Sequence, residues 1–239
     1  MTEPVGPPAS PPTPPPTEPP QPSGAAGNPW ERRASLGGVN AFIEAVKLFA
    51  TSPGEAFSQT HKRGDYGSPL LFAILVGWIG VTIGQIWQTL MGASFLSMMP
   101  AEFRGSIPFV AGSAGGFLLN VIFAPVYIII GLFVWGALLH LCLVIVGGLG
   151  KSQAGFEGSF RVIAYSMVAQ LANLIPIAGG MICLVWTLVL AVIGVQKLHE
   201  TEQGKAVAAV LIPVALCCAC IALSIFVMGA SLMTFFANR

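Results

Sequence analysis

The chain has 239 residues, of which 54% are hydrophobic and only 9% are charged, and its mean hydropathy is +0.77. A globular surface in water carries about a quarter charged residues, so a soluble globular protein is excluded. The net charge of +1 provides no basic face for nucleic acid, and we exclude nucleic-acid binding as well.

The few charges are segregated along the chain. Runs without Asp, Glu, Lys or Arg hold 36, 46, 35 and 33 residues, and they are residues 66–101, 105–150, 162–196 and 206–238. A helix needs about 20 apolar residues to cross the hydrocarbon core of a bilayer, so each run is long enough to span it. The sequence therefore predicts an all-α, polytopic membrane protein.

The first segment, residues 1–29, contains twelve prolines and almost no aliphatic side chains. It cannot bury enough apolar area to offset its chain entropy, so we expect a disordered, proline-rich cytoplasmic tail. It also lacks the apolar stretch of a cleavable signal peptide. The first membrane span is therefore expected to direct insertion.

Residues 30–66 are expected to form short amphipathic helices at the membrane interface. One helical face is apolar and consists of Val39, Phe42, Ile43, Val46 and Phe49. Such a face suits the boundary between headgroups and acyl chains. A second helix is expected to start at Pro53, because proline is favoured in the first helical position. Lys62 and Arg63 follow close to the membrane and are candidates for contact with anionic lipid headgroups.

Residues 67–239 are predicted to form a compact bundle of five transmembrane helices. The run 162–196 would make a helix about 52 Å long, which is too long for a core of about 30 Å. Pro176 with Gly179 and Gly180 breaks this run and predicts a hairpin. The expected spans are about 70–92, 117–146, 160–175, 177–195 and 207–228.

The positions of Lys and Arg indicate the orientation of this bundle. In the arrangement with five spans, nine of them lie on the side of the N-terminus, whereas Arg104 and Arg239 lie on the other side. Cytoplasmic loops are enriched in Lys and Arg. We therefore expect a cytoplasmic N-terminus and an extracytoplasmic C-terminus.

Helices in lipid associate through small and polar residues, and the predicted spans carry stripes of such residues. In the first span, Gly77, Gly80 and Gly84 share one helical face. The packing candidates in the second and third spans are Asn120, Tyr127, Ser166, Gln170 and Asn173. These faces predict close packing within the bundle, and they leave open association with a second copy or with another membrane protein.

No group of residues in the predicted spans specifies a reaction. Pumps and proton-coupled carriers need ionisable groups at membrane depth, yet none of the ten Asp and Glu residues lies in a predicted span. His140 has no carboxylate partner there, so a packing role is favoured over a proton relay. The five cysteines all lie in apolar runs and are expected to act as small packing residues. We expect no catalytic residue, no metal site and no cofactor.

Several short motifs carry a family resemblance. They are Trp30-Glu31-Arg32-Arg33, Phe42-Ile43-Glu44, the stretch from Phe160 to Ser166, Gln170-Leu171, Ile175-Pro176 and Ile212-Pro213. In this order they resemble the Yip family of membrane proteins, in particular its bacterial branch. The resemblance implies five spans and a cytoplasmic N-terminus. Many relatives have a proline where this chain has Ala169, so a kink expected in the third span should be absent.

The resemblance also implies a role. Eukaryotic relatives associate with Rab-type GTPases and with one another in early secretory membranes, whereas a bacterial member would lie in the plasma membrane. We therefore hypothesise a non-enzymatic membrane scaffold or adaptor that contacts membrane lipids and binds a protein partner through its cytoplasmic N-terminal region. The alternative is a transporter or channel for a neutral or lipidic solute. Its cavity would be lined by Asn120, Tyr127, Gln170 and Asn173.

Overall fold

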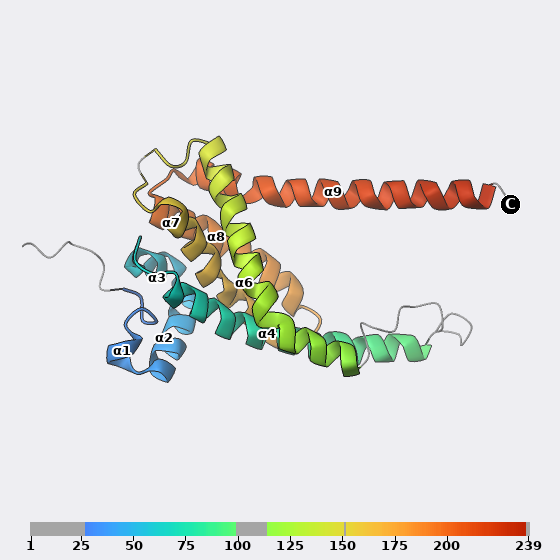
Figure 1. Ribbon diagram of the computed structural model, residues 1–239, viewed down its shortest axis with the longest axis horizontal. Helices are drawn as coiled ribbons and strands as arrows, with labels where there is room; N and C mark the ends of the chain where they lie inside the picture. The colour runs from blue at the N-terminus through green and yellow to red at the C-terminus, as the bar shows by residue number, and fades with distance from the viewer. Residues whose placement is uncertain (1–26, 99–113, 151, 238–239) are drawn as a thin grey trace, which may run out of the picture.

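The computed structural model describes residues 27–98, 114–150 and 152–237, and this part of the chain is helical, without strands (Figure 1). The prediction of an all-α membrane protein is confirmed. Most of the predicted tail, residues 1–26, lies outside the described residues. Arg104, Lys151 and Arg239, on which the predicted orientation partly depends, also lie outside the described residues.

Three short helices come first, and they are α1 (Arg33–Leu36), α2 (Gly38–Thr51) and α3 (Pro53–Gln59). The structure divides the predicted apolar face of α2. Phe49 is fully buried and its ring stacks on that of Tyr165 at 4.8 Å, whereas Val39 and Ile43 remain 74% and 58% exposed. α3 places the Phe57 ring against Gly194. These helices are therefore packed onto the bundle by side chains, and only part of the apolar face is free.

Four described helices are long and apolar enough to cross a membrane. They are α4 (Gly67–Met98), α6 (Ala114–Ile145), α8 (Gly179–His199) and α9 (Gln203–Ala237). They cover the predicted first, second, fourth and fifth spans. The predicted count of five membrane-spanning helices is therefore one too high.

The predicted third span, residues 160–175, accounts for this difference. Its residues form the end of α7 (Gly155–Ser166) and the 3₁₀ helix η2 (Met167–Leu174), which we call together the α7–η2 passage. Position 169 is alanine, and the chain nevertheless leaves α-helical geometry after Ser166. Irregular backbone at membrane depth is tolerated where protein surrounds it. Here α4 and α8 both pack against η2.

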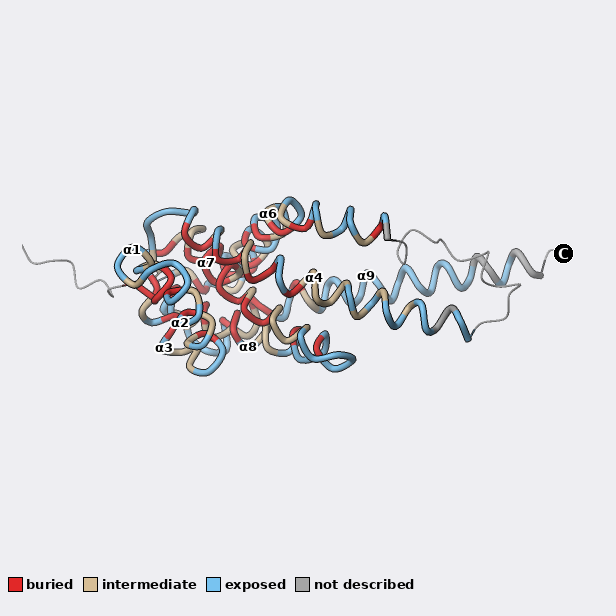
Figure 2. The backbone as a smooth tube through the Cα atoms, turned by 90° about the horizontal axis from the view of Figure 1, so that it is seen from below, coloured by how far each residue is buried: buried red, intermediate tan, exposed pale blue. Residues whose placement is uncertain are grey.

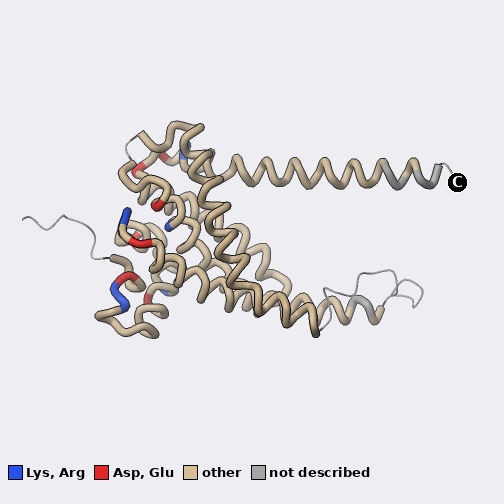
Figure 3. The backbone as a smooth tube through the Cα atoms, viewed as in Figure 1, with Lys and Arg blue, Asp and Glu red and all other residues tan. Residues whose placement is uncertain are grey.

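The Lys, Arg, Asp and Glu residues gather at one end of the described part, beside the short helices and the ends of the long ones, and we call this the charged end (Figure 3). The α7–η2 passage leads away from it to a turn at residues 175–178, where Ile177 has a φ of 67°. α8 then returns antiparallel to the passage. Gly179 lies against Asn173 at the turn, and His199 hydrogen-bonds Ser159 at the charged end. The predicted hairpin around Pro176 is therefore present.

α9 extends from the charged end and projects beyond the body of the molecule (Figure 1). Its first part packs on α6 and α8, but residues 215–230 are all exposed (Figure 2). Because this part is apolar, lipid is its natural neighbour. The exposed region includes Cys217, Cys218 and Cys220, so their predicted packing role is wrong. Only Cys142 and Cys183 are buried.

Candidate functional site

The segment before α1 is folded onto the charged end by its own polar groups. The Asn28 side-chain oxygen accepts hydrogen bonds from the backbone N–H groups of Trp30 and Glu31, at 3.0 and 3.2 Å. This turn directs the Trp30 ring into the core, where it is 4% exposed and donates from Nε1 to the Ser68 carbonyl at 2.7 Å. The same turn directs the Glu31 carboxylate toward α7.

Arg161 of α7 meets this carboxylate in the protein interior. Its side chain is 1% exposed, and Nη1 donates to Glu31 Oε1 at 2.6 Å. Nε and Nη2 donate to Glu157 Oε1 at 3.0 and 2.7 Å, and Nη2 also donates to the Asp65 carbonyl at 2.8 Å. All three guanidinium nitrogens therefore have acceptors, as a buried charge requires.

The Glu31 carboxylate is saturated with donors as well. Tyr165 lies one helical turn after Arg161, and its hydroxyl donates to Oε1 at 3.1 Å. Oε2 accepts from the backbone N–H groups of Asn28 and His61, each at 3.1 Å, and lies 3.0 Å from His61 Nδ1. We call Asn28, Glu31, His61, Glu157, Arg161 and Tyr165 the Glu31–Arg161 cluster. It joins the N-terminal segment, the chain before α4 and the α7–η2 passage into one unit.

Sequence reasoning missed this cluster. Arg161 entered only as one of the nine Lys and Arg residues on the side of the N-terminus and within the motif from Phe160 to Ser166, and Glu31 entered only through the resemblance. One available signal was the spacing of Arg161 and Tyr165, because residues four apart lie on the same face of a helix. A buried tyrosine hydroxyl and an arginine on one face both need an acceptor, but the sequence does not show that Glu31 supplies it.

A second polar chain lies nearby and involves His140. Its Nδ1 is 3.1 Å from the Ser159 hydroxyl, which also lies 3.1 Å from His199 Nε2, and His199 Nδ1 is 2.8 Å from Ser152. His140 therefore has a polar partner that the sequence did not reveal. Within the described ranges, no group of three or more His, Cys, Asp and Glu side chains could hold a metal ion.

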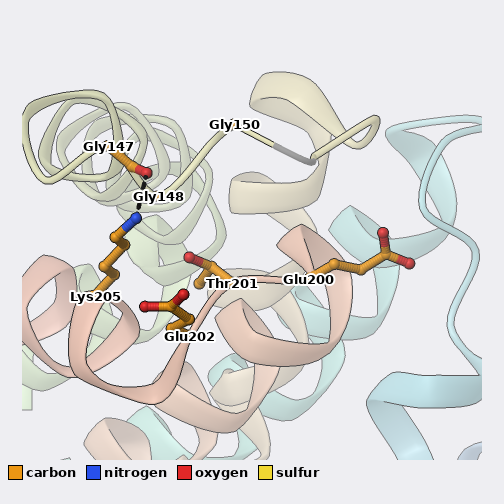
Figure 4. Close-up of a pocket in the computed structure, with 7 residues that line it drawn as sticks. All are labelled: Gly147, Gly148, Gly150, Glu200, Thr201, Glu202 and Lys205. Carbon is orange, nitrogen blue, oxygen red and sulfur yellow. Dashed lines mark hydrogen bonds between the residues drawn. The ribbon is translucent and has the colours of Figure 1, made fainter.

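The charged end also has a shallow hollow between the α6–α7 loop and the α8–α9 turn (Figure 4). Lys205 points to this loop and donates to the Gly147 carbonyl at 3.3 Å. On the other side, Lys62 donates to Glu200 and holds the pKa of that carboxyl below its usual range. These exposed contacts connect loops. Contact of Lys62 and the exposed Arg63 with lipid headgroups remains a prediction.

The predicted packing residues of α4 face the α7–η2 passage. A Cβ atom at Gly77 would meet Met167 and Ile128, one at Gly80 would lie 2.4 Å from the Gln170 carbonyl oxygen, and one at Gly84 would lie 3.6 Å from the Asn173 amide. Asn173 in turn donates to Gln170 Oε1 at 2.9 Å. Ser166 is buried one turn before Gln170.

Asn120 and Tyr127 do not join this seam, contrary to their predicted packing role. Both are exposed on α6. Asn120 donates to the Gly116 carbonyl at 3.0 Å, and the Tyr127 hydroxyl donates to the Asn120 carbonyl at 3.2 Å. Because the Asn120 amide nitrogen and the Tyr127 hydroxyl both donate within α6, these side chains can face lipid. The structure therefore does not bring them together with Gln170 and Asn173 into one solute cavity.

A family model described as the Yip1 domain matches residues 46–225, which include Arg161 and Tyr165 but not Glu31. A comparison with curated proteins found no match, and neither did a comparison with solved structures. The match covers most of the described helices and the part of the α7–η2 passage that carries the cluster.

Proposed function

Because the chain belongs to the Yip1 domain family, we propose that it is a non-enzymatic integral membrane scaffold that recruits a protein partner through its N-terminal region, residues 1–66. The Glu31–Arg161 cluster is the observation that carries this proposal. A scaffold has to hold its docking region in a fixed relation to the membrane. A saturated, buried ion pair between that region and the bundle does this, because displacing the region would remove Glu31 from the buried Arg161 and leave it paired with Glu157 alone.

The N-terminal region also offers a surface. Val39 and Ile43 are large apolar side chains on the free face of α2, and Glu44 and Lys47 are exposed nearby. Apolar side chains within a polar rim are typical of protein interfaces. Since α2 is fixed through Phe49, a partner bound to this face would be held at the charged end.

Co-purification in mild detergent tests the proposal. Deleting all of residues 1–63 would remove Glu31 and destabilise the bundle, so smaller changes are required. We expect the double substitution Val39→Ser and Ile43→Ser, or deletion of residues 1–26, to reduce recovery of a bound protein severalfold in quantitative mass spectrometry. The matched control is Glu44→Ser with Lys47→Ser on the same helix, which should leave recovery unchanged.

Undiminished recovery from both the double substitution and the deletion would contradict recruitment through this region. Equal loss in the control would also contradict it, because the effect would then not belong to the apolar face.

The orientation is part of the same proposal. The described Lys and Arg residues lie at the charged end (Figure 3), and cytoplasmic sides are rich in these residues. We therefore assign the charged end and the N-terminus to the cytoplasm. Because α9 leads away from that end, a reporter fused after Arg239 should be extracytoplasmic, whereas one fused before Met1 should be cytoplasmic. Finding both reporters on the same side would refute the assignment.

A further inference from the structure

A cavity of about 250 Å³ lies between α6, the α7–η2 passage, α8 and α9. Its walls are mostly apolar and include Leu139, Ile163, Leu188 and Pro213. Drug-sized pockets usually have about 300–1,000 Å³, so this one has room for only a segment of a larger molecule. The polar side chains in its wall are those of Ser166, Gln170 and Thr187.

One polar group in the cavity wall is without a partner. Ser166 is 1% exposed and lines the cavity, and its hydroxyl has no hydrogen-bond partner within the described part of the chain. A buried hydroxyl without a partner costs free energy that one hydrogen bond would recover. The unpaired hydroxyl therefore indicates a ligand that is mainly apolar but carries a hydrogen-bonding group.

The cavity reaches the lipid-facing surface. Trp135 of α6 and Leu184 of α8 both line it, and they are 43% and 52% exposed to the outside of the molecule. On the α9 side, Leu211 and Ile212 are exposed, and the stretch that is exposed throughout begins just after Val214, another lining residue. A hydrocarbon chain can therefore enter from the bilayer.

The distance of Ser166 from the charged end favours one hydrogen-bonding group. It lies five residues beyond Arg161, which corresponds to about 7.5 Å along an α-helix, and Arg161 belongs to the ion cluster at the charged end. The headgroup layer on each side of a bilayer is about 5–8 Å thick. With the ion cluster placed in the headgroup layer, the Ser166 hydroxyl lies within reach of the boundary between headgroups and hydrocarbon, where phospholipids have their ester carbonyls.

We propose that this cavity binds one acyl chain of a glycerophospholipid, whose ester carbonyl accepts a hydrogen bond from the Ser166 hydroxyl. The site is separate from the surface assigned to protein recruitment. None of the residues that line the cavity belongs to the Glu31–Arg161 cluster.

Photocrosslinking in nanodiscs tests the proposal. The full chain is reconstituted with phosphatidylcholine that carries a diazirine within one acyl chain, and labelled peptides are identified by mass spectrometry. We expect label on α6, α7–η2, α8 and the first part of α9. Leu188→Trp fills the cavity and should reduce this label to below about a tenth. Val185→Trp, on the exposed face of the same helix and outside the cavity wall, should leave it unchanged.

Ser166→Ala provides a variant that adds no bulk and removes only the hydroxyl. It should fold as well as the original chain, and it should weaken labelling by about threefold to tenfold, the equivalent of one hydrogen bond. Label spread evenly over the exposed part of α9, or unaffected by Leu188→Trp, would overturn the proposal. Labelling by a diazirine fatty acid but not by the phospholipid would overturn it too, because the ester would not be required.

Discussion

Replacing Arg161 with methionine is expected to lower the thermal unfolding midpoint of the protein in mild detergent by on the order of 10 °C. Methionine preserves much of the side-chain volume, but it leaves the Glu31 carboxylate, which is 4% exposed, without its cationic partner. Removing one member of a buried ion pair costs about 3–5 kcal/mol, and 1 kcal/mol corresponds to about 2–4 °C in a chain of this size. Unfolding monitored by intrinsic fluorescence measures the shift.

The exposed ion pair of Lys62 and Glu200 supplies the control. Both side chains are about half exposed, and exposed pairs contribute little because water and salt screen them. Lys62→Met should therefore leave the midpoint nearly unchanged. If Arg161→Met had as small an effect as Lys62→Met, the Glu31–Arg161 cluster would not stabilise the attachment of the N-terminal segment.

The sequence predicts the structure well in segments where one local property, such as a long apolar stretch or a proline within it, determines the fold. α4, α6, α8 and α9 are long apolar stretches, and hydrocarbon leaves such stretches few alternatives to a helix. The hairpin before α8 was also predictable, because Pro176 interrupts a run too long for one crossing. These features depend on local composition, which a single sequence displays directly.

The α7–η2 passage was not predictable in the same way. Its apolar composition resembles that of a span, but Arg161 is paired with Glu31, which is 130 residues away in sequence. No periodicity reports a contact of such separation. The helix type after Ser166 likewise depends on packing against α4 and α8, since Ala169 provides no local reason to leave α-helical geometry.

The histidines illustrate the same limit. His140 has no polar neighbour within its own apolar run, so the sequence suggested an isolated group. In the structure, Ser159 of α7 bridges it to His199 at the end of α8. These contacts can be recognised only when the relative positions of α6, α7 and α8 are known.

Replacing the glycines of α4 with alanine is expected to change stability by very different amounts, although the three glycines share one helical face in the sequence. Gly80→Ala should destabilise the protein by about 3 kcal/mol, at the upper end of the usual cost of overpacking. The added Cβ would lie 2.4 Å from the Gln170 carbonyl oxygen and 2.7 Å from its carbonyl carbon. Because these are backbone atoms of η2, the two elements must separate. Thermal unfolding in detergent should show a lower midpoint.

Gly84→Ala is the matched control, four residues along the same helix. Its Cβ would meet the Asn173 side chain at 3.6 Å, which is an ordinary contact, and alanine favours a helix interior over glycine by up to about 1 kcal/mol. We therefore expect this variant to be neutral or slightly more stable. Gly77→Ala should fall between the two, since its closest contact is the flexible end of Met167. Equal effects at Gly80 and Gly84 would show that α4 does not approach the η2 backbone as closely as the structure places it.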